Sequence, residues 1–363
     1  MTTNTRYRNM RIAFIGSAGV PNRYGGFESF LEHCGPAMAR IVESVHVTCD
    51  AGLYADDLSP DFKGVTRIFL KVPANGAASV LHDLLAFLAV YRRSTHIVVL
   101  GVSGGPWFPL FKLMCRLGGK RLGVNIDGVE WRRAKFSRFK QALLRLFDHL
   151  AQRFCDVVIY DNAGLASFVL PSARPQAAQI GYSGDHVLRL PDVVPAPGTA
   201  LTVCRIEPEN NLDLLIAGAL ASPLRRYTIV GNWNNSAYGQ ALRARHRNET
   251  RLELLDPIYD ARRLAELREG CSMYLHGHSV GGTNPSLVEM LYHDCAVLCF
   301  DVNYNRSTAG EGAAYFSDAP GLARLIGEVM EGRSGGDAGA RLALRARYTS
   351  DAIAKAYVDA MLG

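Results

Sequence analysis

The residues best suited to bind a phosphate lie in the segment 276–289, HGHSVGGTNPSLVE. Asn284 and Pro285 are of the types favoured at the N-cap and the first position of a helix, directly after a glycine-rich turn. Beside the positive end of that helix, four backbone amides are expected to be free to donate to an anion: those of Gly282, Thr283, Ser286 and Leu287. Glu289, one turn further on, can accept hydrogen bonds from a ribose hydroxyl. The alternative is an ordinary capped helix in which Glu289 only compensates the dipole.

Two other segments carry groups that suit a diphosphate. Arg205 follows a predicted strand at 200–204 and precedes the sequence EPENN at 207–211. A guanidinium in that position can contact a phosphate with two hydrogen bonds, unless it is only a solvated surface arginine. Gly25 and Gly26 end the segment GSAGVPNRYGG after the first predicted strand, where paired glycines let backbone amides approach a ligand closely. Glycines are, however, common after the first strand of any doubly wound fold.

A pair of carboxylates follows another predicted strand, 121–125. Asp127 and Glu130 lie in the sequence NIDGVEWRR, at the point where that strand ends. Side chains at the carboxyl ends of parallel strands line the ligand site of such folds, so this pair is a candidate for contacting a substrate. The alternative is a structural turn, because Asp-Gly is a common turn sequence.

Positive charge is concentrated in residues 107–153, which contain eleven Lys and Arg but only three Asp and Glu. Aromatic residues are interspersed, among them Trp107, Phe108, Phe111, Trp131, Phe136 and Phe139. A basic amphipathic face with aromatic side chains is typical of binding to an anionic membrane surface. The residues predicted to contact the membrane or an acceptor there are Trp131, Arg132, Arg133 and Lys135. Nucleic acid and a merely solvated helix face are the alternatives, although no nucleic-acid-binding module is recognisable.

These residues are positioned by an alternation of short apolar runs with amphipathic stretches. Strands are predicted at 11–15, 45–48, 67–69, 97–100, 121–125 and 157–160, and again at 200–204, 227–230, 251–255, 273–276 and 296–300. Helices are predicted at 26–40, 78–92, 108–117, 138–154 and 163–170, and then at 211–220, 237–247, 261–269, 285–292, 319–330 and 338–361. This rhythm indicates an α/β fold with two doubly wound parallel sheets, with a ligand site in a cleft at the carboxyl ends of their strands.

Five prolines between residues 171 and 198 interrupt the rhythm and indicate the domain boundary. The predicted organisation is a first domain at 1–185, a linker at 186–198, a second domain at 199–337 and a last helix at 338–363. The longest apolar runs are far shorter than the ~20 residues that span a bilayer. The eight cysteines form no CxxC pair, so neither a zinc ribbon nor a redox dithiol is indicated. No DxD-type metal site accompanies the phosphate-binding segments, and we expect no metal and no other cofactor.

Five segments that span nearly the whole chain in order resemble retaining glycosyltransferases of the family 4 type, which have the GT-B fold of two Rossmann-like domains facing a cleft. They are RIAFIGSAGVPNRYGGFESFLE, NIDGVEWRRAKFSR, QIGYSGDH, CRIEPENNLDLL and HGHSVGGTNPSLVEML. More closely, the sequence is similar to bacterial rhamnosyltransferases of capsule, O-antigen and exopolysaccharide synthesis. The resemblance implies that the domain at 1–185 lies on the acceptor side and that the domain at 199–337 binds the nucleotide sugar. It also implies that the C-terminal crossover helix, 338–363, packs back toward the first domain.

The resemblance also implies roles for individual residues. Gly25 and Gly26 would face the donor diphosphate and the acceptor, and Arg205 would contact the phosphates. The backbone at 282–287 would bind the phosphates and sugar, Glu289 the ribose, and Asp127 and Glu130 the acceptor, so that Asp127, Glu130 and Arg205 are the expected catalytic residues. The implied donor is dTDP-L-rhamnose, and the implied acceptor is a lipid-diphosphate-linked saccharide at the inner face of the cytoplasmic membrane.

The sequence departs from the broader family at two positions. The first glutamate of the E-x7-E pattern is replaced by Gly281, and the lysine after the EPE-like segment is replaced by Asn210. These changes leave phosphate neutralisation to Arg205 and helix dipoles. Three alternatives remain open from the sequence: a nucleotide-sugar 2-epimerase of the same fold, an inactive nucleotide-sugar-binding module, and a protein that binds an anionic polymer through residues 107–153. A transferase that uses a UDP- or GDP-sugar is a further possibility.

Overall fold

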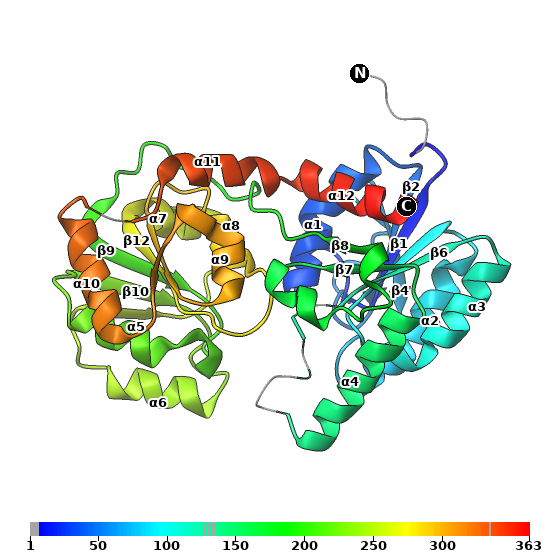
Figure 1. Ribbon diagram of the computed structural model, residues 1–363, viewed down its shortest axis with the longest axis horizontal. Coiled ribbons are helices and arrows are strands. Elements are labelled where there is room, and N and C mark those ends of the chain that lie inside the picture. Colours follow the sequence, from blue (N-terminus) through cyan, green and yellow to red (C-terminus); the bar gives the residue numbers. More distant parts are fainter. Residues whose placement is uncertain (1–6, 127, 130, 132–135, 334) are drawn as a thin grey trace. The chain divides into compact units, whose positions relative to one another are not determined.

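The structure is a computed structural model that describes residues 7–126, 128–129, 131, 136–333 and 335–363. The chain divides into two compact units (Figure 1). Unit 1 comprises Met1–Ser183 together with Ser350–Gly363, and unit 2 comprises Gly184–Thr349. The C-terminal helix is therefore part of the first unit, as the resemblance implied.

Unit 1 is built on an eight-stranded sheet with the strand order β3-β4-β2-β1-β5-β6-β7-β8. Its strands are β1 (Arg11–Ile15), β2 (Ser44–Asp50), β3 (Asp61–Phe62), β4 (Val65–Leu70), β5 (His96–Leu100), β6 (Arg121–Asn125), β7 (Val157–Tyr160) and β8 (Ala177–Gln179). All neighbouring strands are parallel except β3 and β4. The buried runs of β-branched and aliphatic residues, such as His96–Leu100, are those expected of a parallel sheet covered on both faces.

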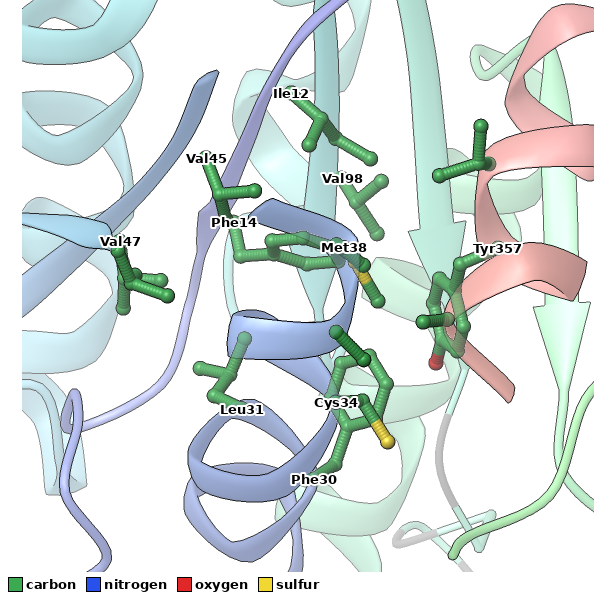
Figure 2. Close-up of a cluster of buried hydrophobic side chains, with 14 of the residues drawn as sticks. Ile12, Phe14, Phe30, Leu31, Cys34, Met38, Val45, Val47, Val98 and Tyr357 are labelled. Atoms are coloured by element: carbon green, nitrogen blue, oxygen red, sulfur yellow. The ribbon is translucent and has the colours of Figure 1, made fainter. Parts of the chain in front are cut away.

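Helices cover both faces of this sheet. They are α1 (Gly26–Ala39), α2 (Ser79–Tyr91), α3 (Phe108–Leu117), α4 (Arg138–Arg153) and α12 (Ser350–Leu362). On one face, α1 and α12 pack against alternate strand residues such as Phe14 and Val98 (Figure 2). Tyr357 of α12 lies beside Phe30 of α1, with ring centroids 4.5 Å apart. On the other face, α2, α3 and α4 pack against Ile97, Val99 and their neighbours.

Unit 2 has a six-stranded, wholly parallel sheet with the order β11-β10-β9-β12-β13-β14. Its strands are β9 (Ala196–Val203), β10 (Arg226–Val230), β11 (Leu252–Leu255), β12 (Cys271–His276), β13 (Ala296–Phe300) and β14 (Ala314–Phe316). Its helices are α5 (Leu212–Leu220), α6 (Ala237–Arg245), α7 (Ala261–Gly270), α8 (Pro285–Met290), α9 (Asn303–Ala309), α10 (Ala319–Met330) and α11 (Ala338–Arg347). Residues of α5, α6 and α10 cover one face, and residues of α8, α9 and α11 cover the other.

The structure differs from several sequence predictions. The helix predicted at 338–361 is two helices, α11 and α12, because the chain leaves the helical path at Tyr348, whose hydroxyl donates to the Thr308 carbonyl 3.1 Å away. The helix predicted at 163–170 is a six-residue 3₁₀ segment, Ala163–Phe168. The short elements β3, β8, α9 and β14 were not predicted. The segment expected as a linker, 186–198, contains the first residues of β9 and also Arg189, whose guanidinium pairs with Glu269 at 2.5 Å.

Candidate functional site

The candidate site of unit 2 lies at the carboxyl edge of its sheet. β9 and β12 are parallel neighbours, so the loops that follow them, 204–211 and 277–284, meet at this edge. In doubly wound folds, ligands bind at the carboxyl ends of the strands. Sequence analysis placed its phosphate-binding residues in these same two loops.

Asn210 fastens the two loops together. Its amide nitrogen donates to the Arg205 carbonyl at 2.7 Å, and its amide oxygen lies 2.9 Å from Nδ1 of His278. Asn211 adds a further hydrogen bond between the two loops, because its side-chain amide donates to the Gly277 carbonyl at 2.8 Å. Asn210 is buried. At the position where the broader family has a lysine, this chain therefore has a residue that holds the two loops together.

Arg205 is exposed, and its guanidinium forms no hydrogen bond or ion pair with any residue that the structure describes. Its backbone, in contrast, is fixed, because its carbonyl accepts hydrogen bonds from both Asn210 and the Glu207 amide. A cation on a rigid loop at this edge can approach an anion without first breaking an ion pair. This arrangement agrees with the phosphate-binding role expected of Arg205, which stays a prediction.

The turn before α8 has the cap that the sequence predicts. Asn284 is the N-cap, and its side-chain oxygen accepts from the Ser286 amide at 3.0 Å. The Leu287 amide donates to the Asn284 carbonyl at 3.1 Å. The expectation that these two amides are free is therefore wrong, since the cap itself satisfies them. Of the four expected donors, those of Gly282 and Thr283 lie outside this cap.

Glycines in the loop after β12 are required by local geometry. A Cβ on Gly277 would lie 2.2 Å from the Asn210 carbonyl oxygen, so only glycine fits at this position next to Asn210. Gly281 has φ = +120°, a conformation that side chains rarely adopt. A glutamate at position 281 would be strained, which gives a physical reason for the departure from E-x7-E.

Glu289 is at the centre of a buried charged group that the sequence did not reveal. Its carboxylate forms an ion pair with Arg268 of α7, and its other oxygen lies 3.3 Å from Nε2 of His186. Burial alone would raise the pKa of Glu289, but the charge of Arg268 and the bond to His186 outweigh it and hold that pKa below its usual range. The ionised carboxylate keeps lone pairs for a further donor, so the expected ribose contact stays a prediction.

His276 ends β12 directly below the loop. It is buried, and its Nε2 has no hydrogen-bond partner among the described residues. Burial, with a smaller contribution from His278, lowers the pKa of His276 to about 3. The imidazole is therefore neutral at physiological pH and cannot supply the positive charge that a diphosphate needs. Among the residues predicted for the donor site, Arg205 is therefore the one that can supply positive charge at this edge of the sheet.

In unit 1, the glycine-rich loop after β1 contains two glycines that packing requires and two that it does not require. A Cβ on Gly16 would lie 2.4 Å from the Leu100 carbonyl oxygen, and one on Gly19 would lie 2.6 Å from Sγ of Cys49, so both are required by packing. Gly25 and Gly26, which begin α1, have negative or extended backbone angles, and a Cβ there would meet only ordinary contacts at 3.4 Å or more. Folding therefore does not require glycine at these two positions, which is consistent with close approach by a ligand.

Several predicted residues lie outside the described part of the chain: Asp127, Glu130, Arg132, Arg133 and Lys135. Trp131 is described and is half-buried. Its Nε1 donates to Asp148 at 3.1 Å, its ring packs edge-on against Phe168, and the guanidinium of Arg145 lies over it. These contacts hold the indole of Trp131 in place, and the membrane contact expected of it stays a prediction.

Other aromatic residues predicted to face a membrane are also turned inward. Phe108 and Phe111 are fully buried against the sheet of unit 1, and Nε1 of Trp107 donates to the Val80 carbonyl at 2.8 Å. Phe139 is 79% exposed. The expectation of a membrane-facing side chain is therefore wrong for Phe108 and Phe111, because both pack into the core of unit 1, and for the other aromatic residues it stays a prediction.

Within the described residues, no three His, Cys, Asp or Glu side chains are grouped as metal ligands would be. No described helix is both long enough and apolar enough to cross a membrane. Sequence reasoning missed Arg268 and His186, which lie 21 and 103 residues from Glu289. Nothing in the local sequence of α7, which reads as an ordinary surface helix, signalled that Arg268 is buried.

Comparisons with known proteins identify the architecture. The sequence profile of a family described as a domain of unknown function, DUF1972, matches residues 9–185. No match was found among curated proteins. Among solved structures, sucrose-phosphate synthase from Thermosynechococcus elongatus is similar with a TM-score of 0.74 and 16% identity, over 96% of this chain and 97% of that one.

Two further structures are similar over nearly their whole length. The lipopolysaccharide outer core galactosyltransferase WaaB, in its apo form, has a TM-score of 0.61 and 13% identity, over 97% of this chain and 99% of that one. A structure described as trehalose-6-phosphate from E. coli bound with UDP-2-fluoro glucose has a TM-score of 0.64 and 11% identity, over 97% and 99%. At such identities the likeness establishes the fold alone. It is α/β, with two Rossmann-like parallel-sheet domains of the GT-B type.

Proposed function

We propose that this chain is a retaining glycosyltransferase that takes its sugar from a nucleotide-diphosphate donor bound by unit 2. The observation that carries the proposal is the arrangement at the carboxyl edge of β9 and β12. Arg205, exposed and without an ion-pair partner among the described residues, stands on a loop that Asn210 holds against the loop before α8. A guanidinium on a fixed loop, beside the glycine-rich turn before α8, suits a diphosphate. The negative charge on that diphosphate increases as the bond between the sugar and the phosphate oxygen breaks.

In this reaction the bond from the anomeric carbon to the diphosphate oxygen breaks while the acceptor hydroxyl attacks from the same face. The acceptor's proton passes to an oxygen of the departing nucleoside diphosphate, so the products are the glycoside and the protonated diphosphate. Arg205 stabilises the leaving charge, and Asp127 and Glu130 orient the acceptor. The proposal includes no metal ion, because Arg205 provides the electrostatic stabilisation of the departing diphosphate.

For the donor we propose dTDP-L-rhamnose, and for the acceptor a lipid-diphosphate-linked saccharide of bacterial cell-surface polysaccharide synthesis. The support is the sequence resemblance to bacterial rhamnosyltransferases, which spans most of the chain. One structural neighbour carries UDP-2-fluoro glucose, so a UDP-sugar is the first competitor to test. The acceptor implies that the protein works as a peripheral protein on the inner face of the cytoplasmic membrane.

Nucleotide preference tests the donor proposal. Calorimetric titration with dTDP, UDP and GDP should give a nucleoside diphosphate affinity that depends on Arg205, with dTDP bound most tightly. Stronger binding of UDP or GDP would overturn the rhamnose donor but keep the transferase. Absence of binding by all three, in a protein that is folded, would contradict the assignment of unit 2 as the donor domain.

A further inference from the structure

The outer sides of α2, α3 and α4 carry three stripes of exposed apolar side chains. Nine residues between 36% and 79% exposed form them: Leu81, Leu85 and Leu88 on α2; Leu110, Leu113 and Leu117 on α3; Phe139, Leu143 and Leu146 on α4. Their spacing of three and four residues places each set along one side of its helix. The opposite sides of the same helices carry the buried residues that pack on the sheet. α2 and α3 are thus apolar on two sides, of which only one serves the core. On α4 the buried side carries Asp148, Ala151 and Gln152, so the exposed stripe is the main apolar side of that helix.

The three stripes belong to one face of unit 1, because α2, α3 and α4 lie on the same side of its sheet (Figure 1). The rings of Phe87 on α2 and Phe111 on α3 stack with centroids 4.0 Å apart. Tyr91 of α2 donates to the Met114 carbonyl of α3 at 2.8 Å. α3 in turn contacts α4. We call this surface, defined by the nine residues above, the leucine face.

The exposed charges on these helices are all positive. Exposed basic side chains are Arg116 on α3 and Arg138, Lys140, Arg145 and Arg153 on α4, and Arg92 and Arg93 follow α2 directly. The acidic residues within the three helices, Asp83 and Asp148, are both buried. Exposed aliphatic side chains among positive charges are complementary to a lipid bilayer, in which anionic headgroups lie over apolar acyl chains.

We infer that the leucine face docks on an anionic lipid bilayer, with its leucines inserted among the acyl chains and its basic residues at the headgroups. The inference rests on the proposed function, in which the acceptor is lipid-linked, and it identifies the physical partner of unit 1. Of the aromatic side chains in the sequence prediction, the face includes Phe139 and leaves out Phe108 and Phe111, which are buried. It adds exposed leucines and extends the surface to α2. A second copy of this chain fits less well, because two such faces in a symmetric dimer would oppose like charges.

Vesicle flotation tests this inference. The full chain should float with phosphatidylglycerol-containing vesicles, and binding should weaken as salt rises but persist in part, since leucine insertion is not screened. The variant Leu85→Gln/Leu113→Gln/Leu143→Gln changes no charge and removes one leucine from each stripe. We expect it to bind these vesicles at least roughly tenfold more weakly, a difference of about 1.4 kcal/mol. Arg116→Glu/Arg145→Glu should reduce the part of the binding that salt weakens.

The matched control is Leu58→Gln/Leu188→Gln/Leu342→Gln, which alters three leucines that are comparably exposed but lie off this face. It should float like the wild type. Equal flotation of both triple variants, or flotation that is independent of anionic lipid, would overturn the inference. So would wild-type self-association that the first triple variant abolishes without any vesicle binding. Calorimetric binding of nucleoside diphosphate by the same variants separates the two proposals, because it should be unchanged whether or not the face binds lipid.

Discussion

The guanidinium of Arg268 on α7 forms an ion pair with the carboxylate of Glu289 on α8, and only 9% and 14% of the two side chains is exposed. Removing one member of such a pair leaves an uncompensated buried charge, which costs ~3–5 kcal/mol. Arg268→Ala should therefore lower the stability of unit 2 by about that amount, measured as hydrogen-exchange protection of its central strands. Arg262→Ala, which removes an exposed pair with Glu266 on the same helix, should cost less than ~1 kcal/mol. Equal effects of the two variants would contradict the structural role of the Arg268–Glu289 pair.

Arg205 should matter for donor binding but little for folding, because its guanidinium has no partner among the described residues. Arg205→Ala is expected to weaken nucleoside diphosphate binding by ~1.5–3 kcal/mol, the range for a hydrogen bond to a charged group. Calorimetry measures the effect, and thermal unfolding should be nearly unchanged. Arg226→Ala is the control, since Arg226 is an exposed arginine at the amino end of β10, away from the loops of the site. An affinity that falls equally in both variants would remove Arg205 from the site.

Asp127 and Glu130 are assigned to the acceptor from sequence alone. Asp127→Asn and Glu130→Gln should reduce sugar transfer much more than they reduce donor affinity, because a residue that orients the acceptor does not contact the nucleotide. Transfer rate and calorimetric affinity are measured on the same preparations. Wild-type turnover in both variants, or parallel loss of transfer and affinity, would indicate that this turn has only a structural role.

Asp83 on α2 gives unit 1 a pH-dependent stability. Burial raises the pKa of this carboxyl to about 8, against a small opposing effect of the Gly104 amide. Because its folded pKa is higher than its unfolded pKa of ~3.9, the folded state holds the proton more tightly, and stability falls by up to ~1.4 kcal/mol per unit as pH rises between these values. Asp83→Asn should flatten this dependence in the hydrogen exchange of β5 and α2. Asp61→Asn, an exposed position, should leave it unchanged, and a flat wild-type profile would show that Asp83 is ionised when folded.

The regular elements could be predicted from the sequence where burial imposes a strong pattern. The strands at Arg11–Ile15, Arg121–Asn125 and Ala296–Phe300 and the helices at Phe108–Leu117 and Ala319–Met330 begin and end as predicted. Each is an apolar run or a clear amphipathic repeat bounded by turn residues. α9, with the polar sequence NYNRSTA, escaped prediction, because what fixes it is tertiary: Asn305 donates to the carbonyls of His278 and Phe300.

The site was predictable as a set of loops but not as a set of contacts. Arg205 and the turn before α8 follow strands, and strand ends are visible in the sequence. The bond between Asn210 and His278 joins residues 68 positions apart, and no local pattern signals it. The same limit explains the aromatic residues of 107–153. α3 has an inner stripe containing Phe108 and Phe111 and an outer stripe of leucines, and composition does not indicate which of them faces the sheet.

The central claim is that this chain transfers a sugar from a nucleotide donor to an acceptor, and mass spectrometry of a complete reaction tests it most directly. Purified protein is incubated with dTDP-L-rhamnose, or with a UDP- or GDP-sugar, and a lipid-diphosphate-linked saccharide. The account predicts that the acceptor gains the mass of one sugar as nucleoside diphosphate is released, with a large loss in Arg205→Ala and none in Arg226→Ala. An acceptor of unchanged mass with every donor, while the nucleotide sugar is converted to an isomer of the same mass, would contradict it and identify an epimerase.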